Sequence, residues 1–328
     1  MDGYRCVSLV KNKINKMFFS ILRLIRFPNL LIVAATQYLM RWFVINPILK
    51  INSFELQLDE LHFALLVFST MCITAAGYII NDYFDRKTDM YNRPERVVIG
   101  KTIDRRLAMI LHIVFNSIGV LLGVYLSFHI DQIGFSVVFM LIAGLLWYYS
   151  TTYKRQFLIG NIIVAILTAL VPFIVVLFEI PLLNVHYKDL LLQTGITFNV
   201  IIWWVAGYSF FAFLTTLFRE IIKDIEDFEG DYELGRNSLP VIIGIFYSKL
   251  IVIFLILITI AALLYVYAGY LSGNFSLMYF IFALFLPLLF LLYKIIRAKD
   301  KNDYHFASNL TKIIMLLGLA YSVALNLL

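Results

Sequence analysis

Residues 61–89 read LHFALLVFSTMCITAAGYIINDYFDRKTD and join an apolar run directly to an acidic one. The part from 61 to 81 contains no Asp, Glu, Lys or Arg, and as a helix it is long enough to cross about 30 Å of hydrocarbon. No proline or glycine separates Ile80 from Asp89, so we expect the same helix to continue into the acidic run. This stretch therefore predicts a membrane-spanning helix that ends in carboxylates.

The whole chain has the composition of a membrane protein. Hydrophobic residues make up 62% of its 328 residues and charged residues only 15%, against about 25% in ordinary soluble domains. The two cysteines give neither a disulfide framework nor metal-ligand spacing. We predict one all-α, polytopic membrane domain, residues 1–328, with nine transmembrane helices near 27–46, 61–81, 107–128, 132–150, 158–180, 198–218, 247–270, 274–293 and 309–327.

Basic residues indicate how these helices are oriented. With nine spans, all but three of the 27 Lys and Arg residues fall on one side, the exceptions being Arg41, Lys50 and Lys188. The positive-inside rule makes that side cytoplasmic, and it also explains the net charge of +6 without nucleic-acid binding. We therefore expect a cytoplasmic lead-in at 1–26, cytoplasmic loops at 82–106 and 219–249, an external C-terminus, and the plasma membrane of a prokaryote.

The first of these two loops begins with an acidic motif. On a helix, Asn81, Asp85 and Asp89 repeat at intervals of four and Asp82 falls on the same face. Like charges at this spacing repel, and carboxylates at a membrane edge are costly to desolvate. A bound hard cation would offset both costs, and oxygen ligands without His or Cys favour Mg²⁺.

A second acidic motif lies at 219–231 and has similar periodicity. Glu220, Asp224, Asp227 and Asp231 would form one stripe on a helix, although Gly230 is expected to bend or end that helix. Arg219 and Lys223 stand beside the stripe. Solvated loop charges are the simplest reading of either motif alone, but two such motifs on one membrane side favour a common site.

Several stretches then make the chain resemble the UbiA superfamily of intramembrane prenyltransferases. The motif at 81–89 is similar to that family's NDxxDxxxD, and 227–231 is similar to its second motif, DxxxD. Further similar stretches are Arg26-Phe27-Pro28-Asn29, Asn92-Arg93-Pro94-Glu95-Arg96, Tyr149-Ser150 with Lys154, Gly160-Asn161, Gly235 and Leu239-Pro240. One stretch departs from the family: Val97 and Val98-Ile99-Gly100 replace a Pro and a P-S-G.

The resemblance implies a ring of nine helices around a central cavity and a set of site residues. Mg²⁺, as two ions bridging a substrate diphosphate, would be held by Asn81, Asp82, Asp85, Asp89, Asp224, Asp227 and Asp231. The diphosphate itself would contact Arg93, Lys154, Lys223 and Arg26. Lys154 and Tyr149 are the expected catalytic residues. No two of the five histidines stand at ligand spacing, so we do not expect a histidine general base.

The implied reaction is Mg²⁺-dependent transfer of a prenyl group from a polyprenyl diphosphate to a lipophilic acceptor. The motif at 219–231 is most similar to the geranylgeranylglyceryl-phosphate geranylgeranyltransferase branch, which serves ether-lipid synthesis. Aromatic, quinone-precursor and chlorophyllide-type acceptors remain alternatives. A divalent-cation transporter is the non-enzyme alternative. Membrane lipids are expected neighbours, and the sequence fixes neither prenyl chain length nor oligomeric state.

Overall fold

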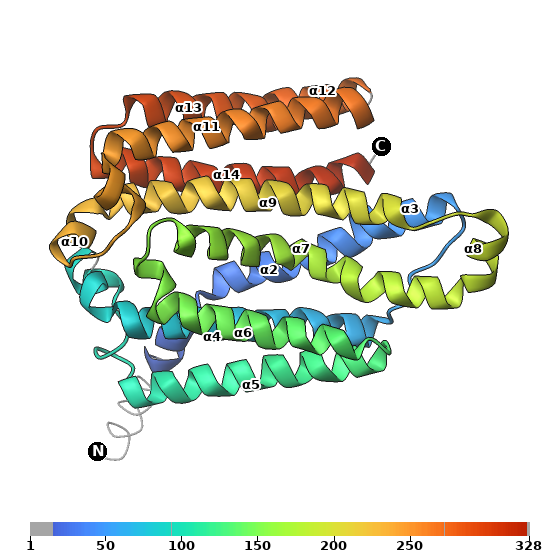
Figure 1. The fold of residues 1–328 in the computed structure, drawn as a ribbon, viewed down its shortest axis with the longest axis horizontal. Helices are drawn as coiled ribbons and strands as arrows, with labels where there is room; N and C mark the ends of the chain where they lie inside the picture. The colour runs from blue at the N-terminus through green and yellow to red at the C-terminus, as the bar shows by residue number, and fades with distance from the viewer. Residues whose placement is uncertain (1–15, 93, 272, 327–328) are drawn as a thin grey trace, which may run out of the picture. The chain divides into compact units, whose positions relative to one another are not determined.

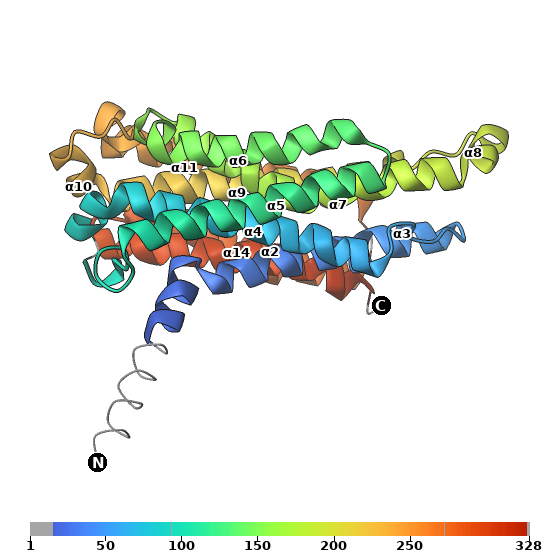
Figure 2. The ribbon, with the colours of Figure 1, turned by 90° about the horizontal axis from the view of Figure 1, so that it is seen from below.

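The computed structural model describes residues 16–92, 94–271 and 273–326, and its regular elements are helices (Figure 1; Figure 2). Within these ranges nine helices are long and apolar enough to cross a membrane. They confirm the predicted fold class and all nine predicted spans. Their bounds are Phe27–Ile51, Glu60–Asn92, Arg105–His129, Ile133–Thr151, Ile159–His186, Asn199–Glu226, Leu239–Tyr270, Asn274–Arg297 and Lys301–Ala324.

The chain divides into two compact units, which we describe separately. Unit 1 comprises residues up to Ala35 together with Asp59–Thr152, and unit 2 comprises Thr36–Leu58 together with Tyr153–Leu328. Unit 1 contains α4 (Glu60–Asn92), α5 (Arg105–His129) and α6 (Ser136–Thr151). The main helices of unit 2 are α7 (Ile159–His186), α9 (Asn199–Glu226), α11 (Leu239–Tyr270), α13 (Leu286–Arg297) and α14 (Lys301–Asn326).

In unit 1, small residues let α4 and α5 approach closely. A Cβ at Gly119 of α5 would lie 2.9 Å from the backbone oxygen of Ser69 and 2.5 Å from the side chain of Ile73. The Ser69 hydroxyl donates a hydrogen bond to the Gly119 carbonyl at 2.6 Å. One turn later, Gly123 leaves room for the ring of Phe139. Close backbone approach through small residues is typical of helix packing in membranes, where no hydrophobic effect drives helices together.

The loop after α4 is fixed to unit 1 by burial. Val98, Ile99 and Ile103 pack in one apolar cluster with Leu24 and Ile79, among others. This explains the departure from the family pattern at 98–100, because the apolar side chains of Val98 and Ile99 belong to this core. Between them and Ile103, Gly100 turns the chain with a φ of +81° and donates to the Ile103 carbonyl at 2.7 Å.

Unit 2 has a larger apolar core, built on one face of α9. That face carries Phe218, Ile221, Ile222 and Ile225, all buried. The neighbouring helices complete it with Val252 and Ile256 of α11, Leu288 and Leu291 of α13, and Ala307 and Ile314 of α14. Because the apolar positions between 218 and 225 face this core, they set the rotation of α9 and of the acidic motif at its end.

A buried ion pair attaches the first membrane helix to α7 within unit 2. Arg41 begins the π-helical turn Arg41–Ile45, which follows α2 (Phe27–Met40) and precedes α3 (Asn46–Ile51). Its guanidinium lies 3.2 Å from Glu179, and both side chains are about 1–2% exposed. The other Glu179 oxygen accepts the backbone N–H groups of Gln57 and Leu58 at 2.5 and 3.2 Å, and Arg41 donates to the Leu58 carbonyl.

We predict that breaking this pair destabilises the protein more than replacing it. In Glu179→Leu the buried guanidinium of Arg41 and two backbone donors lose their acceptor, so the free energy of unfolding should fall by about 3–5 kcal/mol. The double variant Arg41→Met, Glu179→Leu should recover part of that loss. Thermal unfolding in detergent measures both, with exposed Lys188→Met as the control. Equal melting temperatures for Glu179→Leu and the wild type would contradict the prediction.

We also predict that Gly100 cannot be replaced without cost. A Cβ there would lie 2.8 Å from the Arg86 guanidinium, and a left-handed φ costs a residue with a Cβ about 1–2 kcal/mol. Gly100→Ala should therefore lower the unfolding free energy by at least that amount. Gly134→Ala is the matched control, because nothing lies within 4 Å of its added Cβ and its φ is not positive. If both variants unfold at the same temperature, the strain at Gly100 is absent.

Candidate active site

The two acidic motifs lie at the ends of two membrane helices, one in each unit. We call residues 81–89, in the last turns of α4, motif 1 and residues 219–231, at the end of α9 and in α10 (Phe228–Glu233), motif 2. The apolar part of each helix fixes the rotation of its motif, so each motif is described within its own unit.

Motif 1 is helical throughout, as predicted. Helix α4 continues to Asn92, which places Asn81, Asp82, Asp85 and Asp89 on one stripe. Asp85 is only 3% exposed, whereas Asp82 and Asp89 are half-buried. A nearby cation stabilises a buried carboxylate, so the burial of Asp85 is compatible with its predicted role as a metal ligand.

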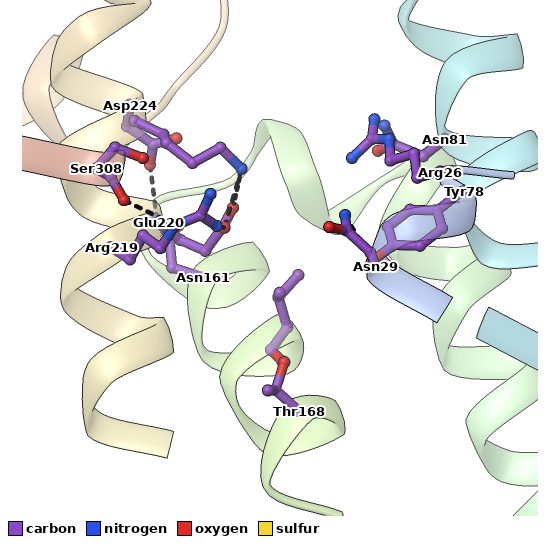
Figure 3. Close-up of polar contacts among 12 residues, drawn as sticks. Arg26, Asn29, Tyr78, Asn81, Asn161, Thr168, Arg219, Glu220, Asp224 and Ser308 are labelled. Atoms are coloured by element: carbon purple, nitrogen blue, oxygen red, sulfur yellow. Dashed lines mark hydrogen bonds and ion pairs between the residues drawn. The ribbon is translucent and has the colours of Figure 1, made fainter. Parts of the chain in front are cut away.

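Arg26 contacts a predicted metal ligand of motif 1. Its guanidinium donates to Asp82 Oδ1 at 2.8 Å and lies 4.7 Å from the centroid of the Tyr78 ring. Figure 3 shows Arg26 beside Asn81 and Tyr78, with Asn29 next to the Tyr78 ring. Arg26 thus neutralises part of motif 1, and its predicted contact with a diphosphate stays a prediction. Arg93, the other basic residue predicted nearby, lies outside the described residues.

Motif 2 is not one continuous helical stripe, and this part of our prediction was wrong. Helix α9 ends at Glu226, Asp227 adopts a turn conformation with φ −96° and ψ 10°, and α10 begins at Phe228. The break comes three residues before Gly230, which is buried inside α10. An aspartate favours such a helix end, because its side chain competes with the helical backbone hydrogen bonds. Asp231 still follows closely, since its N–H bonds to the Asp227 carbonyl at 3.0 Å.

Two basic residues of motif 2 converge on Glu220. Lys223 Nζ lies 2.9 and 2.8 Å from its two carboxylate oxygens, and Arg219 approaches Oε1 at 3.4 Å. Arg219 also donates to the Ser308 carbonyl of α14 at 3.2 Å (Figure 3). Glu220 therefore holds Lys223, a predicted diphosphate contact, against the surface of α9.

Two further carboxylates of motif 2, Asp224 and Glu226, have partners that the sequence pattern does not indicate. Asn161, in the first turn of α7, donates to Asp224 Oδ2 at 2.7 Å (Figure 3). In the sequence, Asn161 stands out only as part of Gly160-Asn161, a stretch similar to the family pattern. His305 of α14 lies 3.0 Å from Glu226, a contact that no local pattern signals because 79 residues separate the two.

Asp231 is buried within α10, shortly before the loop that leads to α11. Burial raises the pKa of its carboxyl above the ordinary value, and the charges of Arg236 and Lys154 oppose that rise. Arg236 is 3.7 Å from Asp231, five residues further along the chain. A cation bound beside Asp231 would favour the ionised carboxylate in the same way that these two basic residues do.

The two expected catalytic residues lie on either side of the point in the sequence where unit 1 ends, at Thr152, and unit 2 resumes, at Tyr153. Lys154 belongs to the short 3₁₀ turn Tyr153–Arg155 of unit 2 and is half-buried. Tyr149 is in the last turns of α6 in unit 1 and is also half-buried. Their catalytic roles stay predictions.

The chemistry of the donors fits a hard cation. Motif 1 offers Asn81, Asp82, Asp85 and Asp89, and motif 2 offers Asp224, Asp227 and Asp231, so every predicted ligand atom is oxygen. Such ligands suit Mg²⁺, which usually takes one or two carboxylates and shares its other positions with water and phosphate oxygens. The buried Asp85 carboxylate is the structural observation that supports this fit.

Comparison with known proteins identifies relatives of this chain over most of its length. The sequence profile of the UbiA prenyltransferase family matches residues 53–317, which include both motifs. The digeranylgeranylglyceryl phosphate synthase of Methanosphaera stadtmanae is 30% identical over 77% of this chain and 85% of its own length. The synthase of the same name from Methanothermobacter thermautotrophicus is 32% identical over 78% and 82%.

Solved structures show the same fold. A structure described as digeranylgeranylglyceryl phosphate synthase in membranes aligns with a TM-score of 0.66 at 22% identity, over 94% of this chain and 98% of the other. A UbiA homologue from Archaeoglobus fulgidus, bound to DMAPP and Mg²⁺, aligns with a TM-score of 0.59 at 17% identity, over 93% and 98%. Together with the profile match, these likenesses show that the chain belongs to the UbiA prenyltransferase family and is an integral membrane prenyltransferase.

Proposed function

We propose that this chain transfers a prenyl group from a prenyl diphosphate to geranylgeranylglyceryl phosphate, a step of ether-lipid synthesis. The single observation that carries the proposal is the similarity to digeranylgeranylglyceryl phosphate synthases over more than three-quarters of this chain. Family membership also favours an enzyme over the divalent-cation transporter that we considered from the sequence.

The reaction requires one bond to break and one to form at the allylic C1 of the donor. The bond from C1 to the diphosphate oxygen breaks, and the electron pair leaves with the diphosphate. The acceptor hydroxyl oxygen bonds to C1 and loses its proton to the diphosphate or to a carboxylate. Because negative charge grows on the leaving diphosphate, preorganised positive charge beside it lowers the barrier.

Motif 1 and the aspartates of motif 2 would hold two Mg²⁺ ions. When bound, Mg²⁺ supplies Lewis-acid stabilisation of the diphosphate oxygens. Support for Mg²⁺ as the ion comes from the A. fulgidus homologue, which is described as bound to DMAPP and Mg²⁺. Asp85, the most buried of the predicted ligands of motif 1, would be the anchor of that set because a cation stabilises a buried carboxylate more than an exposed one.

The basic residues would bind and orient the diphosphate. Lys223, held by Glu220, and Lys154, close enough to Asp231 to influence its pKa, are the candidates in unit 2. Arg93 and Arg26 are the candidates near motif 1, with Arg26 also positioning Asp82. Tyr149 would contribute an electron-rich ring that stabilises developing positive charge on the prenyl carbon.

Two features of the chain support the proposed acceptor and the proposed cytoplasmic position of the two motifs. Both relatives described above are digeranylgeranylglyceryl phosphate synthases, and the chain covers more than four-fifths of each. The strong bias of Lys and Arg toward one side of the membrane supports a cytoplasmic position for both motifs in a prokaryotic cell. An aromatic, quinone-precursor or chlorophyllide-type acceptor is the alternative.

We predict that Asp85→Asn and Asp227→Asn each lower the rate of prenyl transfer by at least about 100-fold, because each removes a charged ligand from the site that stabilises the leaving group. Removing Mg²⁺ with EDTA should abolish turnover, and adding Mg²⁺ should restore it. Diphosphate release by the detergent-purified protein measures these rates. Glu229→Gln is the matched control, because Glu229 is an exposed carboxylate of α10 that we do not assign as a ligand. Substantial activity in Asp85→Asn would disprove the assignment of motif 1.

We further predict which acceptor gives product. Purified protein supplied with Mg²⁺ and geranylgeranyl diphosphate should form digeranylgeranylglyceryl phosphate from geranylgeranylglyceryl phosphate, as mass spectrometry would show. Aromatic acceptors supplied under the same conditions should give no product. Product from an aromatic acceptor alone would overturn the acceptor assignment while leaving the prenyltransferase in place.

A further inference from the structure

A second cluster of ligand-type side chains lies at the end of α4 opposite motif 1. Asp59 precedes the first residue of α4, His62 lies in its first turn, and His129 is the last residue of α5. All three belong to unit 1, and Asp82 of motif 1 lies 20 residues beyond His62 on α4, about 30 Å along the helix axis. The cluster is therefore separate from the proposed active site.

The two carboxylate oxygens of Asp59 make different contacts. Oδ1 accepts the backbone N–H groups of Leu61 and His62, each at 3.0 Å, and so caps α4. Oδ2 faces the two imidazoles instead. It lies 2.5 Å from His62 Nδ1 and 3.9 Å from His129 Nε2. The helix cap thus fixes one carboxylate oxygen between two nitrogens.

The imidazoles of His62 and His129 are themselves close. Their ring centroids are 3.5 Å apart with an interplanar angle of 5°. One ligand atom from each of the three residues lies within 4.8 Å of the others. Our sequence reasoning found no histidine pair, because 67 residues separate these two and only the packing of α4 on α5 brings them together.

Two neighbouring features hold this arrangement. The Tyr125 hydroxyl lies 3.1 Å from His62 Nε2, so the ring nitrogen that faces away from Asp59 also has a partner. Metal-bound histidines almost always use their second nitrogen in this way. The close contact at Gly119 and Ser69 fixes α5 against α4, which sets the place of His129 relative to His62.

We propose that Asp59, His62 and His129 form a Zn²⁺ site. Two imidazole nitrogens and one carboxylate oxygen are a ligand set that suits zinc, with water in the fourth position. Nitrogen ligands make the same site unsuitable for Mg²⁺, which prefers oxygen. His62 would bind through Nδ1 and donate its Nε2–H to Tyr125. Because the two rings are stacked and an imidazole binds metal in its own plane, the His129 ring would turn out of the stack to direct Nε2 at the same ion. Zinc would then join the start of α4 to the end of α5.

Zinc binding by the full-length protein in detergent tests this site. The titration contains saturating Mg²⁺, which occupies the oxygen ligands of the two motifs. The wild type should bind one more equivalent of Zn²⁺ than the double variant His62→Gln, His129→Gln, and each single variant should bind that equivalent more than about tenfold more weakly. His186→Gln and His305→Gln are matched controls that should retain it. Zinc should also raise the unfolding temperature of the wild type but not of the double variant.

Equal zinc stoichiometry and affinity in the wild type and the double variant would overturn the proposal. X-ray absorption of the zinc-loaded wild type gives a test that does not depend on how any variant folds. Two imidazole ligands in that spectrum support the site. A spectrum dominated by sulfur, or one with no imidazole, overturns it because the zinc then lies elsewhere.

Discussion

Carboxylates at the ends of apolar helices must be neutralised, and this constraint governs the arrangement of both units. Moving an unpaired charge out of water is so costly that each acidic side chain needs a cation or a donor close by. Arg26 donates to Asp82, Asn161 donates to Asp224, and Arg41 pairs with Glu179. Each of these contacts joins two segments that are far apart in the chain. The partner that stabilises each carboxylate therefore also determines which segments pack together within a unit.

Those features that depend on local sequence were predictable. The nine spans follow from apolar length, and the distribution of Lys and Arg supports the same count without reference to apolar length. The helical register of motif 1 follows from the spacing of Asn81, Asp85 and Asp89 on a stretch without a helix breaker. In each case the feature depends on residues within about one helical turn, or within the length of one membrane-spanning helix.

Features that depend on contacts between distant segments were not predictable. The partners Asn161 and Asp224 are 63 residues apart, and His305 lies 79 residues from Glu226. The helix break at Asp227 also escaped prediction, because the periodicity of motif 2 continues through it while the backbone does not. Likewise, the stacking of His62 on His129 depends on how closely α5 approaches α4, which the spacing of histidines does not encode.

The length of α4 has a consequence for how a substrate reaches motif 1. The helix has 33 residues, whereas about 20 suffice to cross the hydrocarbon. The surplus, roughly 20 Å of helix at 1.5 Å per residue, is long enough to extend motif 1 beyond the hydrocarbon core into the headgroup region. A prenyl diphosphate bound as we propose could then leave its hydrocarbon tail in the bilayer while its diphosphate reached the aspartates of motif 1. On that proposal the enzyme would not need to extract its donor from the membrane, because lateral diffusion within the bilayer would deliver the donor.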